Sequence, residues 1–192
     1  NRKMTWEGVA DGAVRAVWGL FKKLVIGERI AIAVDYLFAN YQSYTGLIVF
    51  MGVAMYGIQV YADFSGGMDI VRGVSQMLGI ELELNFNQPY FSSSVEEFWR
   101  RWHITLGAWM KEYVFYPLAL SKRFGALSKK IKASRFGHTA AGLHTSKVLA
   151  TSIASLIVFL LVGVWHGATS NYILWGLYNG VILAISALLE PA

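Results

Sequence analysis

Three stretches without any charged side chain constrain this chain more than any other feature of the sequence. They cover residues 45–62, 148–165 and 172–189, and each is 18 residues long. At about 1.5 Å of rise per residue, a helix of this length spans roughly 27 Å, close to the hydrocarbon thickness of a bilayer. Three such stretches in a short chain predict an all-α membrane protein built as a multi-pass helical bundle. They argue against buried helices of a soluble domain.

Composition supports this prediction. Hydrophobic residues make up 55% of the chain and charged residues 15%, whereas average proteins have about 25% charged residues. The sequence contains no cysteine, which excludes disulfides, cysteine metal ligands and a thiol nucleophile. The formal net charge of +5 is modest, and the basic residues lack the interleaved aromatic residues typical of nucleic-acid binding. We therefore expect a lipid bilayer, and no nucleic acid, as a partner.

Two further segments are predicted to be helices that carry charge. Residues 11–38 have a helical pattern, but their charges indicate a span whose charged side faces protein or a helix near the interface. Ser94 and Glu97 form a capping box that opens a helix over residues 94–116, where Pro117 is expected to end it. The charges of this second helix predict an interfacial or re-entrant position.

Two polar segments separate these elements. Residues 63–69 contain Gly66 and Gly67, which permit either a tight turn or a close approach of backbones. Residues 121–147 carry seven basic side chains and no acidic one. Because short basic loops stay in the cytoplasm, we expect a cytoplasmic loop here, with the following span running outward.

The four histidines differ in their surroundings. His166 closes the uncharged stretch 148–165, and an ionisable group at membrane depth suggests a functional role. Because an imidazole titrates near neutral pH, it can act as a general base. His103 lies in the tryptophan-rich helix, whereas His138 and His144 are expected to be solvated loop residues. Metal-binding, serine-hydrolase and nucleotide-binding motifs are absent from the sequence, so no metal is expected.

Several motifs occur in an order that resembles a known family. These are Asp63-Phe64-Ser65-Gly66-x-x-Asp69, Asn85-Phe86-Asn87-x-Pro89-Tyr90, Glu97-Phe98-Trp99-Arg100-Arg101-Trp102-His103-Ile104-Thr105-Leu106, Tyr113-x-x-Tyr116-Pro117-Leu118, Trp165-His166-Gly167-Ala168 and Trp175-Gly176-x-x-Asn179-Gly180. Together they strongly resemble the membrane-bound O-acyltransferase (MBOAT) family, in its bacterial branch of alginate O-acetylases and teichoic acid D-alanyl transfer proteins. After Pro117-Leu118 the sequence departs from the glycine-rich continuation usual in that branch, which indicates a subfamily with a different donor or partner.

The resemblance implies a fold, an activity and a site. The family forms a funnel of membrane spans around a central tunnel, so residues 1–192 are expected to be the catalytic-core part of a longer chain in the bacterial cytoplasmic membrane. By position in the motifs, His166 corresponds to the catalytic histidine and His103 to a second family histidine. For His103 three roles remain open: orienting the acceptor, hydrogen-bonding the carbonyl oxygen or shaping the tunnel. Asp63, Asp69, Asn85 and Asn87 are expected to be structural.

The implied reaction moves an acyl group, acetyl by preference, from a thioester to a hydroxyl group. The donor is acetyl-CoA or an acyl-carrier thioester that acts as a co-substrate, with no bound cofactor. Expected partners are the donor or a carrier protein on the cytoplasmic side, and an envelope polysaccharide or partner acyltransferase outside. The alternatives are D-alanyl transfer to teichoic acid and a non-enzymatic polytopic scaffold or export component.

Overall fold

The computed structural model describes residues 3–189, which form helices joined by turns and loops. These residues belong to two compact units, residues 1–85 and 86–192, each described below by itself. Three helices are long and apolar enough to cross a membrane: α3 (Gly46–Met77), α8 (Ala140–His166) and α9 (Ser170–Leu189). Each uncharged stretch falls on one of them, which confirms the prediction of an all-α membrane protein.

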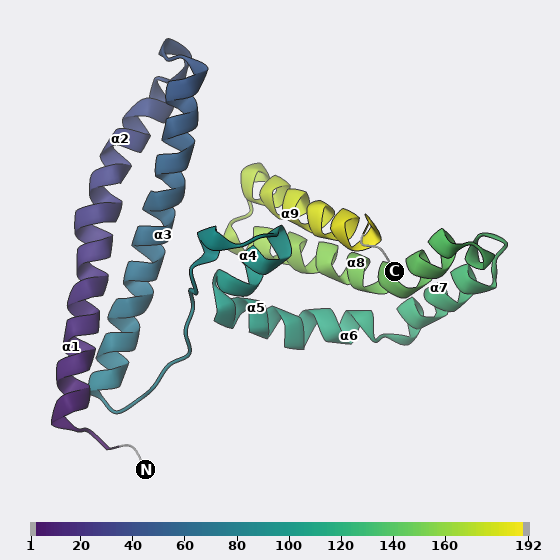
Figure 1. Cartoon of the computed structure of the whole chain (residues 1–192), viewed down its shortest axis with the longest axis horizontal. Coiled ribbons are helices and arrows are strands. Elements are labelled where there is room, and N and C mark those ends of the chain that lie inside the picture. Colours follow the sequence, from purple (N-terminus) through teal and green to yellow (C-terminus); the bar gives the residue numbers. More distant parts are fainter. Residues whose placement is uncertain (1–2, 190–192) are drawn as a thin grey trace. The chain divides into compact units, whose positions relative to one another are not determined.

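The first unit is a helical hairpin. Helix α1 (Trp6–Leu20) continues through a π-helical segment (Phe21–Gly27) into α2 (Glu28–Ala39), and a short turn (Tyr41–Ser43) leads into α3. Figure 1 shows α3 lying along the whole length of α1 and α2. The predicted helix over residues 11–38 lies within the first arm of this hairpin.

Glycines bring the two arms of the hairpin into backbone contact. A Cβ atom at Gly66 would lie 2.7 Å from the backbone oxygen of Gly19, and one at Gly73 would lie 2.5 Å from that of Gly12. Since real Cβ atoms do not approach oxygen this closely, any larger residue would push the helices apart. Small residues at helix interfaces have this role in membrane proteins.

Polar side chains also join the two arms. Lys22 Nζ donates to Ser65 Oγ over 3.0 Å and lies 2.7 Å from Asp69 Oδ2. Lys23 forms an ion pair with Asp63. Residues 63–69 therefore form no turn but lie inside α3, because the neighbouring helix provides partners for their side chains. The sequence left open whether the glycines of this segment permit a tight turn or a close approach of backbones. The structure shows a close approach at Gly66.

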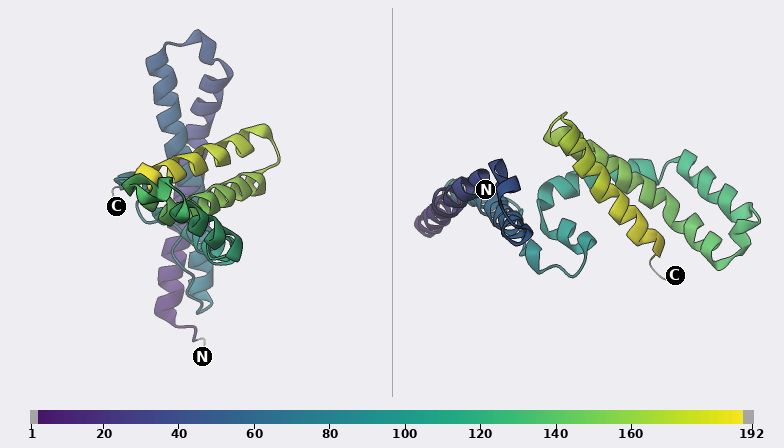
Figure 2. Two further views of the ribbon diagram at one scale, coloured as in Figure 1. Left: turned by 90° about the vertical axis from the view of Figure 1, so that its right-hand side faces the viewer. Right: turned by 90° about the horizontal axis from the view of Figure 1, so that it is seen from above.

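The second unit is centred on the pair α8 and α9, which run antiparallel and side by side (Figures 1 and 2). Here too glycines set the spacing. A Cβ atom at Gly163 would lie 2.5 Å from Tyr172 O, and one at Gly176 would lie 2.4 Å from Phe159 O. This close packing places the end of α8 against the first turns of α9.

Residues 121–147 are not the loop that the sequence predicted. They contain α7 (Lys122–Ala133), a short turn (Phe136–His138) and the beginning of α8. The Ser121 hydroxyl caps α7 by accepting a hydrogen bond from Phe124 N, and basic residues in its last turn complement the helix dipole. The basic charge that suggested a loop therefore lies largely on a helix.

The assignment of His144 to a solvated loop is also wrong. His144 lies on α8, and its Nε2 atom is 3.1 Å from Ala187 O of α9. His138 is exposed in the turn before α8, as predicted.

The predicted helix over residues 94–116 is interrupted and extends further than expected. It consists of α4 (Val95–Arg101), α5 (Ile104–Met110), a π-helical segment (Lys111–Phe115) and α6 (Tyr116–Ala119). Pro117 does not end the helix. It lies in the first turn of α6, where a missing backbone N–H is tolerated.

Candidate active site

A sharp corner between α4 and α5 positions the first candidate residue, His103. Trp102 has an extended backbone, with φ −105° and ψ 128°, and His103 is left-handed, with φ 47° and ψ 51°. Trp102 forms an antiparallel bridge with Phe86, and Asn87 N donates to Arg101 O over 3.0 Å. These contacts replace helical hydrogen bonds at the corner. Histidine is among the residues that adopt the left-handed conformation more readily than most.

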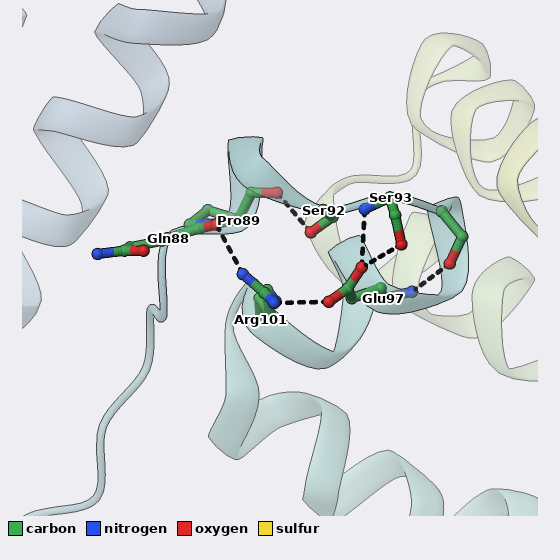
Figure 3. Close-up of polar contacts among 7 residues, drawn as sticks. Gln88, Pro89, Ser92, Ser93, Glu97 and Arg101 are labelled. Atoms are coloured by element: carbon green, nitrogen blue, oxygen red, sulfur yellow. Dashed lines mark hydrogen bonds and ion pairs between the residues drawn. The ribbon is translucent and has the colours of Figure 1, made fainter.

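A network of polar contacts holds α4 and the segment before it, as Figure 3 shows. Ser94 Oγ accepts from Glu97 N over 3.1 Å, which confirms the predicted helix cap. The Glu97 carboxylate accepts from the N–H and the hydroxyl of Ser93, each over 2.7 Å. Arg101 donates to Glu97 over 2.5 Å and to Gln88 O over 3.5 Å. Hydrogen bonds from Ser93, together with the charge of Arg101, lower the pKa of Glu97 to about 2.

The second candidate, His166, is surrounded by aromatic rings. It is the last residue of α8, and its ring stacks on Tyr172 with centroids 6.0 Å apart. The ring of Trp175 meets it edge-on at 5.4 Å. Gly167 leaves room for this arrangement, because a Cβ atom there would lie 2.7 Å from the Tyr172 ring. His166 itself is exposed, so a substrate can approach this residue.

The structure brings both predicted histidines into contact with one tryptophan. The centroid of the Trp165 ring is 5.0 Å from that of His166 and 6.4 Å from that of His103. Burial lowers the pKa of the half-buried His103 ring, and the nearby His166 lowers this pKa further. His103 is therefore predominantly neutral at pH 7, and a neutral imidazole has one nitrogen that donates and one that accepts.

Comparison with known proteins identifies the family. A sequence model of the MBOAT, membrane-bound O-acyltransferase family, matches residues 13–134. The chain belongs to this family. The matched region includes His103, and pairwise similarity to individual MBOAT proteins extends over nearly the whole chain.

Three relatives illustrate that similarity. A probable alginate O-acetylase of Pseudomonas syringae pv. tomato is 37% identical over 185 residues, which cover 96% of this chain and 31% of the relative. The peptidoglycan O-acetyltransferase of Helicobacter pylori is 34% identical over 96% of this chain and 31% of its own length. The teichoic acid D-alanyltransferase of Bacillus subtilis is 31% identical over 86% of this chain and 38% of its own length. The chain thus spans about a third of these relatives.

Sequence reasoning missed part of this candidate site. Tyr172 and Trp175 both contact His166, and their spacing of three residues on one helix places them on the same face. This spacing could have identified Tyr172 and Trp175 from the sequence as residues that share one face of the helix. Trp99 of α4 adds to the aromatic rings around His166. Its ring centroid lies 5.7 Å from that of Trp175 and 5.1 Å from that of Phe159. Within residues 3–189, no three His, Asp or Glu side chains lie together as metal ligands would.

Proposed function

We propose that this protein is a membrane-embedded O-acyltransferase that moves an acyl group, acetyl by preference, from a thioester to a hydroxyl group of an envelope polymer. Its membership of the MBOAT family supports the reaction class. The observation that carries the proposal is the placement of His166 at the exposed end of an apolar helix, among aromatic rings and beside the Trp165–His103 contact.

In the proposed mechanism His166 is the general base. A neutral imidazole nitrogen of His166 accepts the proton of the acceptor hydroxyl as the oxygen attacks the acyl carbonyl carbon. The new C–O ester bond forms, the C–S bond of the thioester breaks, and the proton passes from His166 to the departing thiolate. General base catalysis typically contributes about 10²–10⁴-fold to the rate.

Aromatic rings suit this role because they pack against the His166 ring while the residue stays exposed. Tyr172 and Trp175 fix the orientation of the His166 ring, and a fixed near-attack geometry is a large part of the catalysis of acyl transfer. We assign His103 to positioning, since its neutral ring contacts the same Trp165 ring that His166 contacts. From there it orients the acceptor hydroxyl.

The substrates follow from relatives whose names specify envelope polymers. These relatives are described as acting on alginate, peptidoglycan and teichoic acid, so we propose an extracytoplasmic polymer or a relay acyltransferase as acceptor. Acetyl-CoA or an acyl-carrier thioester supplies the acyl group from the cytoplasmic side. No bound cofactor is required, because the thioester is already activated.

D-alanyl transfer to teichoic acid is the second candidate. The Bacillus subtilis and Streptococcus thermophilus relatives bear that name at 31% and 30% identity. Six relatives that are 34–37% identical to this chain over 96–99% of it are named for acetyl transfer, which favours acetyl.

The test compares wild type, a deletion and His166→Gln in the natural host, with matched protein amounts in the membrane. Ester-linked acetate and D-alanine on envelope polymers are quantified, and His138→Gln serves as the control because His138 lies in an exposed turn. Loss of one ester in His166→Gln, as in the deletion, supports the proposal and identifies the acyl group. Retention of both esters in His166→Gln, with loss of one in the deletion, would favour the scaffold or export alternative.

A further inference from the structure

The hairpin of the first unit has a cavity that the proposed mechanism does not use. The cavity has a volume of about 460 Å³ and is open rather than enclosed. It lies between α1 and α3 and is lined by Asp11, Val14, Arg15, Trp18, Asp69 and Gln76. Three of these side chains are charged and one is an amide, so the cavity suits a polar ligand.

Two opposite charges at this cavity have no charged partner within residues 3–189. Asp69 is paired with Lys22, but Asp11 and Arg15 take part in no ion pair there. Their spacing of four residues on one helix would permit such a pair. The Nε atom of Arg15 is buried without an acceptor in this part of the chain, so its charge is partly withdrawn from water, which is costly for an unpaired group. A ligand with one negative and one positive group fits these two side chains.

The position of the cavity along α3 corresponds to the headgroup layer of a bilayer. Helix α3 has 32 residues and is about 48 Å long, whereas the hydrocarbon core is about 30 Å thick. The uncharged stretch 45–62 has the length of the hydrocarbon core. Asp69 is seven residues beyond residue 62, about 10 Å further along the helix axis. At that level a bilayer presents phosphates and other polar headgroup atoms.

An exposed apolar strip leads from the cavity toward the hydrocarbon level. The two arms of the hairpin run antiparallel (Figure 1), and Gly27 packs against Asp63 at the end of the uncharged stretch. Between the cavity and Gly27, the side chains of Trp18, Phe21 and Leu24 are exposed. The Trp18 ring stacks on that of Phe21, with centroids 5.4 Å apart, and tryptophan is enriched at the headgroup level of membranes. A polar cavity that continues into an apolar strip matches the shape of an amphiphile.

We infer that this cavity binds a phospholipid whose headgroup carries a primary ammonium, of the phosphatidylethanolamine class. Arg15 binds the phosphate, because a guanidinium matches phosphate oxygens in charge and geometry. Asp11 accepts hydrogen bonds from the ammonium, and one acyl chain lies along Trp18 and Phe21. The headgroup has no net charge, which matches a cavity whose two unpaired charges cancel. This inference does not depend on the proposed acyl transfer.

The test uses the full-length natural protein in detergent, with one phospholipid added at a time. The three lipids share their acyl chains and are phosphatidylethanolamine, phosphatidylcholine, whose ammonium cannot donate a hydrogen bond, and phosphatidylglycerol, which has no ammonium. Native mass spectrometry measures the affinity for each lipid, and the melting temperature is recorded with each. The variants are Arg15→Gln and Asp11→Asn. Arg29→Gln is the matched control, because Arg29 is exposed on the same hairpin and does not line the cavity.

The two variants should change lipid binding in different ways. Wild type and Arg29→Gln should bind phosphatidylethanolamine about 10-fold more tightly than the other two lipids, the range for hydrogen bonds between charged groups. Asp11→Asn should bind phosphatidylethanolamine no more tightly than phosphatidylcholine. Arg15→Gln should bind all three lipids about 10-fold more weakly, because they share the phosphate. Since a ligand of the folded state stabilises it, phosphatidylethanolamine should raise the melting temperature most in wild type and Arg29→Gln.

Three results from these measurements would overturn the inference. The first is an equal affinity of wild type for the three lipids. The second is wild-type affinity for all of them in Arg15→Gln. The third is an unchanged preference for phosphatidylethanolamine in Asp11→Asn, a variant that keeps the test decisive if Arg15→Gln does not fold, because Asp11 is exposed.

A cross-linking experiment identifies what fills the cavity in the membrane. Val14 lines the cavity and is 71% exposed, so the photo-reactive p-benzoylphenylalanine replaces it in the full-length protein. After irradiation of isolated membranes, mass spectrometry of the peptide that contains position 14 should find an attached phospholipid. A cross-link to another segment of the chain instead would show that protein fills the cavity, and would overturn the inference.

Discussion

The two units use the same device to bring helices together and differ in the surroundings of the ionisable groups on their long helices. In both, glycines let one helix touch the backbone of the next, as at Gly66 on α3 and Gly176 on α9. In the first unit the charged groups bind one another across the hairpin, as Lys22 does with Asp69. In the second unit, the ionisable group at the end of α8, His166, contacts aromatic rings and remains exposed.

This difference separates ionisable groups that hold helices together from ionisable groups that can take part in a reaction. A charge that is satisfied by a fixed partner stabilises an arrangement of helices, whereas a base needs a nitrogen accessible to a substrate. On this view, substitutions in the first unit change how much protein folds, and substitutions around His166 change what the folded protein does. The following predictions test that separation.

The glycine contacts give the largest expected effect on stability. Gly66→Ala and Gly176→Ala each place a Cβ atom less than 3 Å from a backbone oxygen, and overpacking of this kind costs about 1–3 kcal/mol. Gly67→Ala is the control, because a Cβ atom there meets nothing within 4 Å. That variant should gain about 0.5–1 kcal/mol from helix propensity. Melting temperatures in detergent check the opposite signs, and equal effects at Gly66 and Gly67 would contradict the contact.

The Lys22–Asp69 pair gives an expected effect of similar size. Its side chains are 14% and 22% exposed, so Asp69→Asn leaves a largely buried lysine without its counter-charge and should destabilise the protein by about 1–3 kcal/mol. The double variant Lys22→Met with Asp69→Leu should recover most of that loss, because two apolar groups replace the pair. Thermal unfolding measures both. A double variant no more stable than Asp69→Asn would show that the pair has another role.

The left-handed backbone of His103 predicts a smaller effect. Asparagine tolerates this conformation better than alanine does, so His103→Ala should be less stable than His103→Asn by about 1 kcal/mol. Both variants lack the imidazole and should lose activity to the same extent per folded molecule. Equal melting temperatures would show that the corner relaxes once the histidine is removed.

Substitution of Glu97 is expected to have the smallest effect on stability, and this effect should depend on pH. Its pKa of about 2 lies below the ordinary value of 4.5, so its contribution to stability is complete above pH 4.5 and is lost as the pH falls toward 2. Glu97→Gln should therefore lower the melting temperature at pH 7, with a difference from wild type that shrinks between pH 4.5 and 2. A difference that stays constant with pH would rule out the charge as its cause.

The sequence predicted the features that depend on local pattern. Uncharged stretches revealed the spans, and the capping pattern revealed the start of α4. The break at Trp102–His103 was missed because it depends on backbone pairing with Phe86, which lies outside the helix. The helical character of residues 63–69 was missed for a similar reason, since the partners of Asp63 and Asp69 lie on another helix.

The site was predicted in part. His103 and His166 were identified from motif positions, but their shared contact with Trp165 could not be, because it depends on how α4, α5 and α8 pack. Tyr172 was missed because Gly167 is what allows its ring to reach His166. The basic stretch before α8 was misjudged, since the same charges suit a helix as well as a loop.

The most direct test of the account measures turnover per folded molecule and melting temperature together for His166→Gln and Asp69→Asn. We predict that His166→Gln keeps the wild-type melting temperature and loses about 10²–10⁴-fold in acyl transfer. Asp69→Asn should melt earlier and keep its turnover per folded molecule. If His166→Gln instead transferred acyl groups at a rate within a few-fold of wild type, His166 would not be the base, and the separation between the two units would not hold.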